Sequence, residues 1–587
     1  MDMKQTIYMI LAAAALAVSA SCVKLDLTSP TQASSENWYA NVQQIDISLN
    51  DSYRTAFWGI ESEYWTDRRT DDWAQRDQVY DLCNGATTSA TSTYNTYWTN
   101  TYKVISRSIR ILEAIKDKHN DSDAFAAQKA EAYFFLAYMY ARMATYWGNA
   151  PFYEKSITIE EAKTMRRTGR DTLATKVYEY YDKAIEGLPE INNGRGLYRA
   201  NKYAAMALKA RFALYRASTA AKENRDGKAD FRMCADLCKK IMDSENYSLY
   251  YSAENVADSY GELFRQKNYN SEFMFLISTS IGLEEGATAE NIKSWVLRTA
   301  GGNAVAQPSW DLLAAYEMTN GKTIDEEGSG FNSHDPYANR DPRCCMTFAA
   351  PGTKVFDVVF DPNPNATQVM DYQSGKMVKN KDTKANDNYA PYNGCCIRKG
   401  EQPEWRSVLL NENPWIIMRY ADVLLMYAEA KMELNEIDGS VLDAINSIRA
   451  RAYGVTLDET DKYPAITTGV QKDLRKIIRR ERRVELAWEG RRLDDLRRWG
   501  LLEKCYSTHY YGLLNASGLK GYVADGNWFW PSTPKLDEDG FADFSPWEAA
   551  GLITKYGHHV YDSKVELFPV PDDELKVDPY LGQNPGY

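Results

Sequence analysis

The sequence is poor in the residues and motifs that most enzymes use for catalysis. It has only five histidines among 587 residues, and none is spaced from a serine, a cysteine or an acidic residue as in a hydrolase or a zinc site. Phosphate-binding glycine loops and the G-x-S-x-G, H-E-x-x-H and EF-hand patterns are also missing. We therefore expect no metal ion and no cofactor. A glycan-cleaving enzyme that uses two carboxylates stays open, because sequence cannot show the distance between two acids.

The cysteines form no metal-binding pattern either. Nine are present, with Cys234 and Cys238 one helical turn apart and two adjacent pairs at 344–345 and 395–396. An exported protein can form disulfides, including one between the two adjacent pairs. Unpaired buried thiols are the alternative, and the sequence does not decide between them.

Long apolar runs are absent after the first 21 residues. The apolar run Ile7–Val18 follows Lys4 and precedes small residues, as in a secretory signal peptide that is too short to span a membrane. Cys22 then stands where a lipoprotein carries its acyl chains, although Ser19 occupies a position that is more often leucine. We expect a signal peptide over residues 1–21 and a lipid anchor at Cys22. The alternative is a cleaved periplasmic protein without lipid.

Basic excess and flexible linkers are missing as well. The net charge is −12, which argues against a nucleic-acid partner. No Pro-, Gly- or Ser-rich stretch divides the chain, so we expect residues 22–587 to form one domain. Aromatic residues are abundant instead, with 41 Tyr and 15 Trp. Such rings suit both core packing and contact with carbohydrate faces.

Apolar residues spaced by three and four predict helices over much of the chain. Alanine alternates with large aromatic residues in 130–153 and 201–217, as in closely packed helical hairpins. We predict a mainly α fold, a tetratricopeptide-like helical-hairpin scaffold with long irregular loop insertions. The scaffold is expected at about 40–250 and 406–500, a variable insertion at about 251–405 and a C-terminal loop region at 501–587. The predicted helices are 101–118, 125–147, 172–188, 202–221, 419–435, 440–452 and 471–499.

The last of these helices contains an unusual density of charge. Residues 474–500 hold nine arginines, one lysine and five acids around apolar positions at helical spacing. The acids lie within helical reach of Arg482, Arg492, Arg497 and Arg498, so we predict a helix whose charges pair with one another. Its helical phase predicts that Trp488 is buried.

This segment also resembles a family signature. ERRVELAWEGRRLDDLRRWG (481–500) is similar to the ERR-x-EL-x-x-EG-x-R-x-x-DL-x-RWG signature of the SusD/RagB family, the surface glycan-binding lipoproteins of Bacteroidetes-type bacteria. Residues 415–434 and 444–452 resemble the family's RYADVLLMYAEA and N-x-IR-x-RA helices. ELFPVPDDEL and the final LGQNPGY resemble its LFPIP and QNPGY segments. The likeness extends over residues 22–587.

The resemblance implies a function that composition alone does not reveal. Members of the family are anchored in the outer membrane, exposed at the cell surface, and deliver a bound oligosaccharide to a SusC-like TonB-dependent transporter. We therefore expect a non-enzymatic protein with an oligosaccharide ligand and this transporter as its partner. Binding of peptides or glycopeptides by the same arrangement is the alternative. A secreted glycan-cleaving enzyme fits the missing motifs least well.

The expected binding loop is YWTDRRTDDWAQRDQVY, residues 64–80. Its tryptophans can act as platforms for sugar rings, and its aspartates and arginines can bind hydroxyl groups. In starch-binding members of the family, an Asp and an Arg of this loop contact glucose together with aromatic residues of the loop and the later insertion. The alternative is that the tryptophans are packed and the charges are paired. The expected ligand-binding residues are Trp65, Asp72, Trp73, Arg76 and Trp295.

Overall fold

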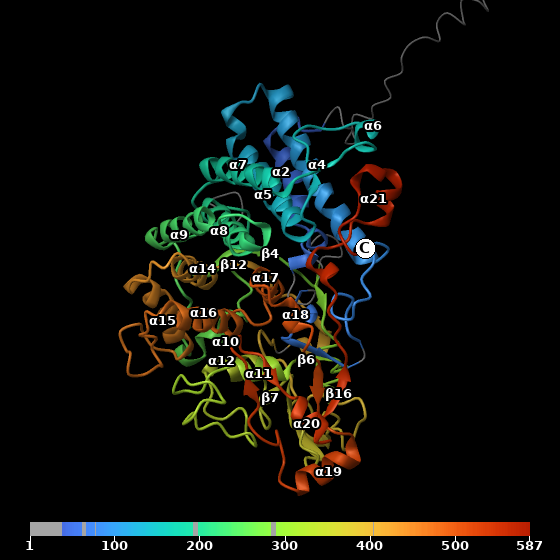
Figure 1. Ribbon diagram of the computed structural model, residues 1–587, viewed down its shortest axis with the longest axis vertical. Coiled ribbons are helices and arrows are strands. Elements are labelled where there is room, and N and C mark those ends of the chain that lie inside the picture. The colour runs from blue at the N-terminus through green and yellow to red at the C-terminus, as the bar shows by residue number, and fades with distance from the viewer. Residues whose placement is uncertain (1–37, 62–65, 77, 192–197, 283–288, 403) are drawn as a thin grey trace, which may run out of the picture.

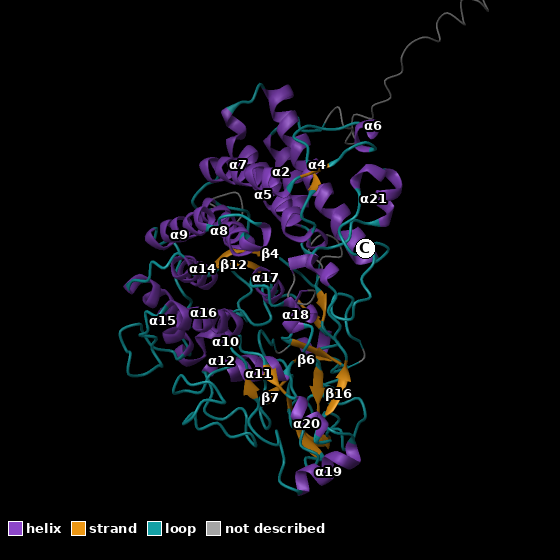
Figure 2. Ribbon diagram, viewed as in Figure 1, coloured by secondary structure: helices purple, strands orange, loops and turns teal. Residues whose placement is uncertain are grey.

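The computed structural model describes residues 38–61, 66–76, 78–191, 198–282, 289–402 and 404–587. It is mainly helical, with short strands in small sheets, which confirms the predicted fold class (Figure 2). The predicted signal peptide and Cys22 lie outside these residues. In the part of the chain that the structure describes, no helix has both the length and the apolar character needed to cross a membrane.

The scaffold helices pack in the order of the chain (Figure 1). Helix α4 packs on α5, α5 on α7, α7 on α8 and α8 on α9; α14 then packs on α9, α15 and α16. This arrangement of hairpins is the tetratricopeptide-like scaffold predicted from the sequence. The helices of the scaffold are α2 (Val42–Asn50), α4 (Ser92–His119), α5 (Ala126–Tyr146), α6 (Ile159–Ala162), α7 (Arg170–Gly187), α8 (Lys202–Thr219), α9 (Lys228–Asp243), α14 (Tyr420–Glu433), α15 (Gly439–Ala452), α16 (Gln471–Glu485) and α17 (Arg492–Arg498).

Local sequence explains where these helices begin and end. Asn201 precedes α8, and its side chain accepts a hydrogen bond from the backbone N–H of Ala204 at 2.8 Å. Helix α4 ends at Asn120, which adopts the left-handed conformation that terminates many helices. Six predicted helices are found with shifted ends. Helix α9 was not predicted, although its buried Cys234, Cys238 and Ile241 follow helical spacing.

The predicted helix over residues 471–499 is wrong in one respect, because it is two helices. Helix α16 ends at Glu485 and α17 begins at Arg492. Between them, Trp488 and Gly490 have positive φ angles of 58° and 71°, which a continuous helix cannot contain. Trp488 is buried as expected. Its ring packs in a second core beside the helical one, and the break in the helix is what allows it to do so.

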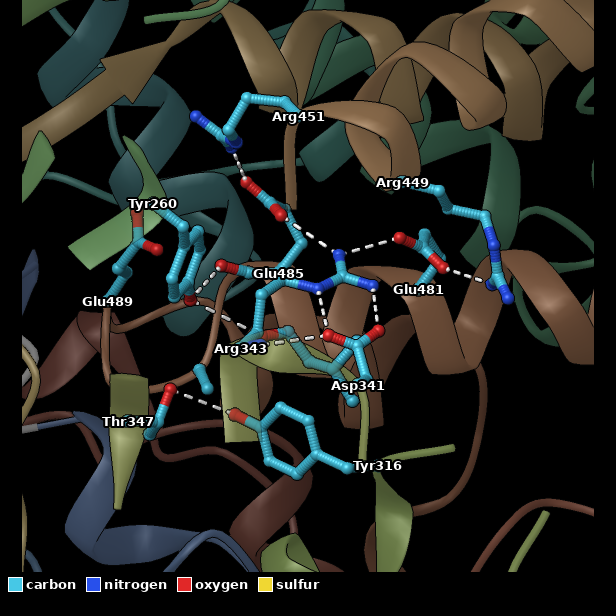
Figure 3. A network of polar contacts seen from close by, with 12 residues as sticks. Tyr260, Tyr316, Asp341, Arg343, Thr347, Arg449, Arg451, Glu481, Glu485 and Glu489 are labelled. Atoms are coloured by element: carbon cyan, nitrogen blue, oxygen red, sulfur yellow. Dashed lines mark hydrogen bonds and ion pairs between the residues drawn. The ribbon is translucent and has the colours of Figure 1, made fainter. Parts of the chain in front are cut away.

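The charges of α16 are paired, but mainly with other elements. Arg343 donates to Glu481 at 2.6 Å and to Glu485 at 2.9 Å (Figure 3). Arg419 also donates to Glu485, at 2.7 Å. Arg451 also pairs with Glu485. Burial would raise the pKa of Glu485, but these three guanidinium groups hold it well below its usual range. The prediction that the charges pair within one helix therefore holds only locally, as for Arg498 with Asp495.

The remaining elements are short and belong mostly to the insertion and the C-terminal region. The helices are α10 (Ser259–Leu263), α11 (Trp310–Ala315), α12 (Pro342–Thr347), α13 (Trp405–Val408), α18 (Leu502–Cys505), α19 (Ala516–Ala524), α20 (Ser545–Ala549) and α21 (Asp572–Val577). The strands are β1 (Trp73–Gln75), β2 (Ala150–Pro151), β3 (Arg167–Thr168), β4 (Phe273–Ile277), β5 (Glu290–Asn291), β6 (Ala306–Pro308), β7 (Lys354–Val355), β8 (Val358–Val359), β9 (Gln368–Asp371), β10 (Lys376–Lys379), β11 (Leu410–Asn411), β12 (Trp415–Arg419), β13 (Tyr510–Gly512), β14 (Lys535–Leu536), β15 (Ala542–Asp543) and β16 (Thr554–Gly557).

These strands pair across long sequence distances. Strand β1 pairs antiparallel with β6, β4 with β12, and β13 with β16, while β7 to β10 form a four-stranded sheet. Strands β1, β6, β7 and β8 contribute residues to a second hydrophobic core, which we call the tryptophan-rich core. The helical core is a separate cluster formed largely by α4, α5, α7, α8, α9 and α14. The buried tryptophans that define the second core are Trp73, Trp295, Trp310, Trp405, Trp488, Trp530 and Trp547.

Candidate functional site

The predicted binding loop runs through the interior for much of its length. Trp65 lies outside the described residues, so its predicted role stays a prediction. Trp73 is on β1 and is completely buried. Its ring stacks on Trp488 with centroids 4.5 Å apart and contacts Trp295 edge-on. This burial contradicts the expectation that Trp73 offers an open face to a sugar, because the antiparallel pairing of β1 with β6 turns the ring into the tryptophan-rich core.

Asp72 is also buried, contrary to the prediction. Its Oδ1 accepts a hydrogen bond from Nε of Arg483 at 2.8 Å, while the adjacent Asp71 pairs with Arg483 and Arg492. Burial would raise the pKa of Asp71, but the two guanidinium groups hold it well below its usual range. These carboxylates fasten the loop to α16 and α17. The sequence left open whether these acids are paired or bind a ligand. In the structure, Asp71 and Asp72 are paired with arginines.

Trp295 is the third predicted residue that the structure places inside. It is 3% exposed and contacts Trp405 and Trp488 edge-on, with ring centroids 6.1 and 5.7 Å apart. Its ring is part of the tryptophan-rich core. It is therefore not available as a platform in this structure.

Arg76 differs from the others because it lies at the surface beside an exposed ring. Its Nη1 donates to the backbone oxygen of Asn303 at 3.1 Å and also to that of Tyr389. Its guanidinium lies 5.2 Å from the ring centroid of Tyr389, which is 57% exposed. Arg298 approaches the same ring to 5.5 Å and donates to Asp387 at 3.0 Å. An exposed aromatic face is thus held among charged donors and acceptors.

A second tyrosine extends this surface. Tyr392 is half-buried, and the Nζ atom of Lys384 lies 4.4 Å from its ring centroid while donating to the backbone oxygen of Leu513 at 2.9 Å. Burial lowers the pKa of Lys384 to about 8. We call the group Arg76, Arg298, Lys384, Asp387, Tyr389 and Tyr392 the Tyr389 surface.

The part of the loop on either side of Arg76 also borders a polar cavity of about 530 Å³. The Nη1 atom of Arg68 donates to the hydroxyl of Tyr80 at 3.0 Å, and its guanidinium lies 4.5 Å from that ring centroid. Tyr97 and the hydroxyl side chains at the start of α4 line the opposite side. The cavity adds donors and acceptors to the face of the protein that the loop forms.

Sequence reasoning missed Tyr389. It lies in NDNYAPYNG (386–394), where turn-forming Asn, Asp, Pro and Gly surround two tyrosines. This composition marks an irregular surface loop, and a tyrosine within such a loop is a sound candidate for an exposed ring. Its partnership with Arg76 could not be found from sequence, because more than three hundred residues separate them.

The described cysteines form no disulfide, and the described residues contain no group suited to a metal ion. All eight cysteines from Cys83 to Cys505 are unpaired, and seven are buried. Across the described ranges, no group of three or more His, Cys, Asp or Glu side chains is arranged to hold a metal ion. The chemistry that the Tyr389 surface can supply is recognition by stacking and hydrogen bonding.

The scaffold and its irregular insertion place the chain among the tetratricopeptide-like helical proteins. The sequence profile of the SusD family matches residues 266–587, which is more than half of the chain. A second profile, described as starch-binding and associating with the outer membrane, matches residues 23–214. The chain belongs to the SusD family.

Individual relatives agree with this assignment. A SusD-like protein of Formosa agariphila is 26% identical over 431 residues, covering 69% of this chain and 70% of that protein. The crystal structure of a SusD-like carbohydrate-binding protein from Bacteroides fragilis has a TM-score of 0.71 at 22% identity, covering 92% of this chain and 99% of that one. A structure determined with a xylogluco-oligosaccharide has a TM-score of 0.64 at 17% identity, covering 92% and 98%.

Proposed function

We propose that the protein binds an oligosaccharide at the Tyr389 surface. The observation that carries this proposal is the exposed ring of Tyr389, which lies near the guanidinium groups of Arg76 and Arg298 and the carboxylate of Asp387. Sugars present apolar C–H faces that stack on aromatic rings and hydroxyl groups that both donate and accept hydrogen bonds. The Tyr389 surface offers partners for both. The polar cavity beside Tyr80 can accommodate further sugar units.

Relatives support the same ligand class. One solved relative is described as a carbohydrate-binding protein, and another was determined with a xylogluco-oligosaccharide. The family resemblance implies that an arginine of the loop at residues 64–80 contacts the sugar. Of the predicted residues that the structure describes, Arg76 lies at the surface next to an exposed aromatic ring. The proposal includes no catalytic step, in keeping with the sequence, which has no motif for a nucleophile or a metal.

Replacement of Tyr389 by alanine tests the proposal. A glycan array and calorimetry on the mature chain should first identify a ligand, and a peptide panel should be screened alongside. Tyr389→Ala should then weaken binding by about 1–3 kcal/mol, the cost of truncating an aromatic contact at an interface. The melting temperature should stay the same because more than half of the ring is exposed. Arg76→Ala should have a smaller effect, because water can replace part of its hydrogen bonding.

Tyr372 provides a matched control. It is 51% exposed, and Lys354 lies 5.0 Å from its ring centroid, but it lies in the turn between β9 and β10 and not in the Tyr389 surface. Tyr372→Ala should leave affinity unchanged. Equal losses in both variants, or an unchanged affinity for Tyr389→Ala, would show that the ligand binds elsewhere. A ligand found only in the peptide panel would replace the carbohydrate class with the peptide one.

We also infer that the mature protein is anchored in the outer membrane by lipid on Cys22 and delivers its ligand to a SusC-like TonB-dependent transporter. The family profile that refers to the outer membrane supports this location, as does the signal-like sequence before Cys22. Cells should incorporate labelled palmitate into the wild-type protein, and Cys22→Ala should release it from the membrane fraction. Copurification of a transporter with detergent-extracted wild-type protein tests the partner. A variant that stays in the membrane would exclude the anchor.

A further inference from the structure

A groove on another part of the molecule has the features of a second binding site. It encloses about 600 Å³ between α4, the segment 151–165 and the C-terminal elements α21 and Pro579–Leu581. Figure 1 shows α21 beside α4 and α6 near the end of the scaffold where the described chain starts. The residues that line this α4–α21 groove are separate from the Tyr389 surface and from the cavity at Tyr80.

The floor of the groove is aromatic and fixed in place. The rings of Tyr102 and Tyr153 are nearly parallel, with centroids 6.2 Å apart and an interplanar angle of 17°. The hydroxyl of Tyr102 donates to the backbone oxygen of Pro151 at 2.8 Å, and the hydroxyl of Tyr153 lies 3.1 Å from Oγ of Ser106. Both rings are half-buried, so each retains an accessible edge or face. Rings held in this way offer contact area without losing side-chain freedom on binding.

The two walls carry opposite charge. On α4, Lys103 and Arg110 are exposed, and neither forms a hydrogen bond or an ion pair with a described residue. They are seven residues apart on the helix, which is roughly 10 Å along its axis. On the other wall, Asp578 is 3% exposed, and its Oδ1 accepts a hydrogen bond from the backbone N–H of Tyr580 at 3.0 Å. Its Oδ2 is buried without a hydrogen-bond partner among the described residues.

The accessible acceptor on this wall is Glu574, which is half-buried and lines the groove. Asp578 adds negative charge behind it, but its Oδ2 atom is closed to solvent. The wall formed by α21 thus accepts hydrogen bonds, whereas the wall formed by α4 donates them.

The walls are joined before any ligand arrives. Asn95 of α4 donates to Asp573 of α21 at 2.9 Å. Arg167 of β3 donates to the backbone oxygen of Leu581 at 2.8 Å and to the side chain of Asn584 at 2.7 Å. The groove is therefore a feature of the folded protein, and binding does not require its walls to be brought together.

We propose that the α4–α21 groove is a second oligosaccharide site that takes an acidic sugar chain. Hydroxyl groups of the sugar donate to Glu574, its C–H faces lie on the tyrosine floor, and its carboxylate or sulfate groups pair with Lys103 and Arg110. A polyanion without hydroxyl donors would meet like charge on the α21 wall. The ligand class rests on the proposed carbohydrate-binding function, but the residues of the groove are different ones.

Calorimetry on the mature chain tests the proposal with three probes of similar length: oligogalacturonate, a sulfated carrageenan oligosaccharide and neutral cellohexaose. At least one anionic probe should bind. The double variant Lys103→Gln/Arg110→Gln should weaken the binding of this probe at least tenfold. Adding Tyr102→Ala to the double variant should weaken it further. The response to the two anionic probes distinguishes carboxylate from sulfate as the group recognised. Added salt should weaken binding to the wild type more than to the double variant.

Lys116→Gln is the matched control, because Lys116 is an exposed lysine of the same helix outside the groove. This control and Tyr389→Ala should both leave binding of the anionic probe unchanged. Loss of all binding in Tyr389→Ala would leave the proposed function standing and overturn the second site. Failure of both anionic probes to bind would overturn it too, as would binding insensitive to Lys103→Gln/Arg110→Gln. In these cases the glycan array and Tyr389→Ala still test the proposed function on its own.

Discussion

The helical core and the tryptophan-rich core are built in different ways. In the helical core, alanines, aliphatic residues and aromatic rings recur at helical spacing, and each helix satisfies its own backbone hydrogen bonds. The tryptophan-rich core has only short strands and helices around it. Seven tryptophans fill it together with phenylalanine and tyrosine rings. Backbone groups there are often paired by side chains from distant segments, as when Nε1 of Trp310 donates to the backbone oxygen of Asn393 at 2.7 Å. Segments with helical spacing of apolar residues can build a core from neighbouring helices, as in the helical core. Segments without such spacing need partners that are distant in sequence, as in the tryptophan-rich core.

A buried ionic network lies where the two regions meet. Arg343 of the insertion is completely buried and pairs with Asp341, Glu481 and Glu485, two of which belong to α16 of the scaffold. A network of this kind contributes little net stability relative to apolar packing, but it tolerates the loss of a partner badly. It fixes how the insertion sits on the scaffold. The Tyr389 surface depends on that placement, since Arg76 and Tyr389 come from different parts of the chain.

The largest expected effect comes from breaking the network at its centre. Glu485→Ala should lower the free energy of unfolding by about 5 kcal/mol, the upper end of the cost of breaking a buried ion pair, because Arg343, Arg419 and Arg451 all lose a partner. Chemical denaturation measures the loss. Glu433→Ala is the control, because its pair with Arg475 is partly exposed and should cost at most about 1 kcal/mol. Similar losses in the two variants would contradict the structural importance of the junction.

A smaller effect is expected from emptying the tryptophan-rich core. Trp488→Ala should destabilise the protein by about 3–5 kcal/mol, because the ring is 5% exposed and its removal leaves Trp73 without its stacking partner. Hydrogen exchange should increase first in the insertion and only later in α5 and α8. Trp488→Phe keeps an aromatic ring and should lose less than half as much. Uniform loss of protection would show that the two cores unfold as one unit.

The smallest expected effect is a change with pH in the free energy of unfolding, caused by Asp311 beside the tryptophan-rich core. Burial, together with the nearby Asp71 and Asp72, raises the pKa of Asp311 to about 8 against an unfolded value of 3.8, despite the opposing influence of Arg483. The folded protein therefore retains a proton that the unfolded chain releases. This contribution to stability is fully present below about pH 4 and is lost as the pH rises to about 8. From pH 6 to pH 7, the interval to be measured, wild-type stability should fall relative to that of Asp311→Asn by about 1 kcal/mol. Parallel profiles for the two proteins would contradict the shift.

Much of the scaffold could be predicted because its information is local. Spacing of three and four marks α5, α7, α8, α14 and α15, and the family resemblance identified the class of protein. The same local reasoning failed at Trp488. A helical pattern continues through this residue. In the structure, however, its side chain packs in the tryptophan-rich core, and the helix is broken at this point. Spacing cannot reveal a competing use of a residue when the partners lie hundreds of positions away.

The candidate site shows the same division. By itself, the sequence determined a mainly helical scaffold, a charged and aromatic loop at residues 64–80 and an irregular insertion. The tertiary structure decided which of the loop's side chains face solvent. Strand β1 pairs with β6 and turns Trp73 inward, the arginines of α16 and α17 bind Asp71 and Asp72, and Arg76 is left at the surface. Burial depends on what packs against a residue, and for Tyr389 and Arg76 that neighbour comes from more than three hundred residues away.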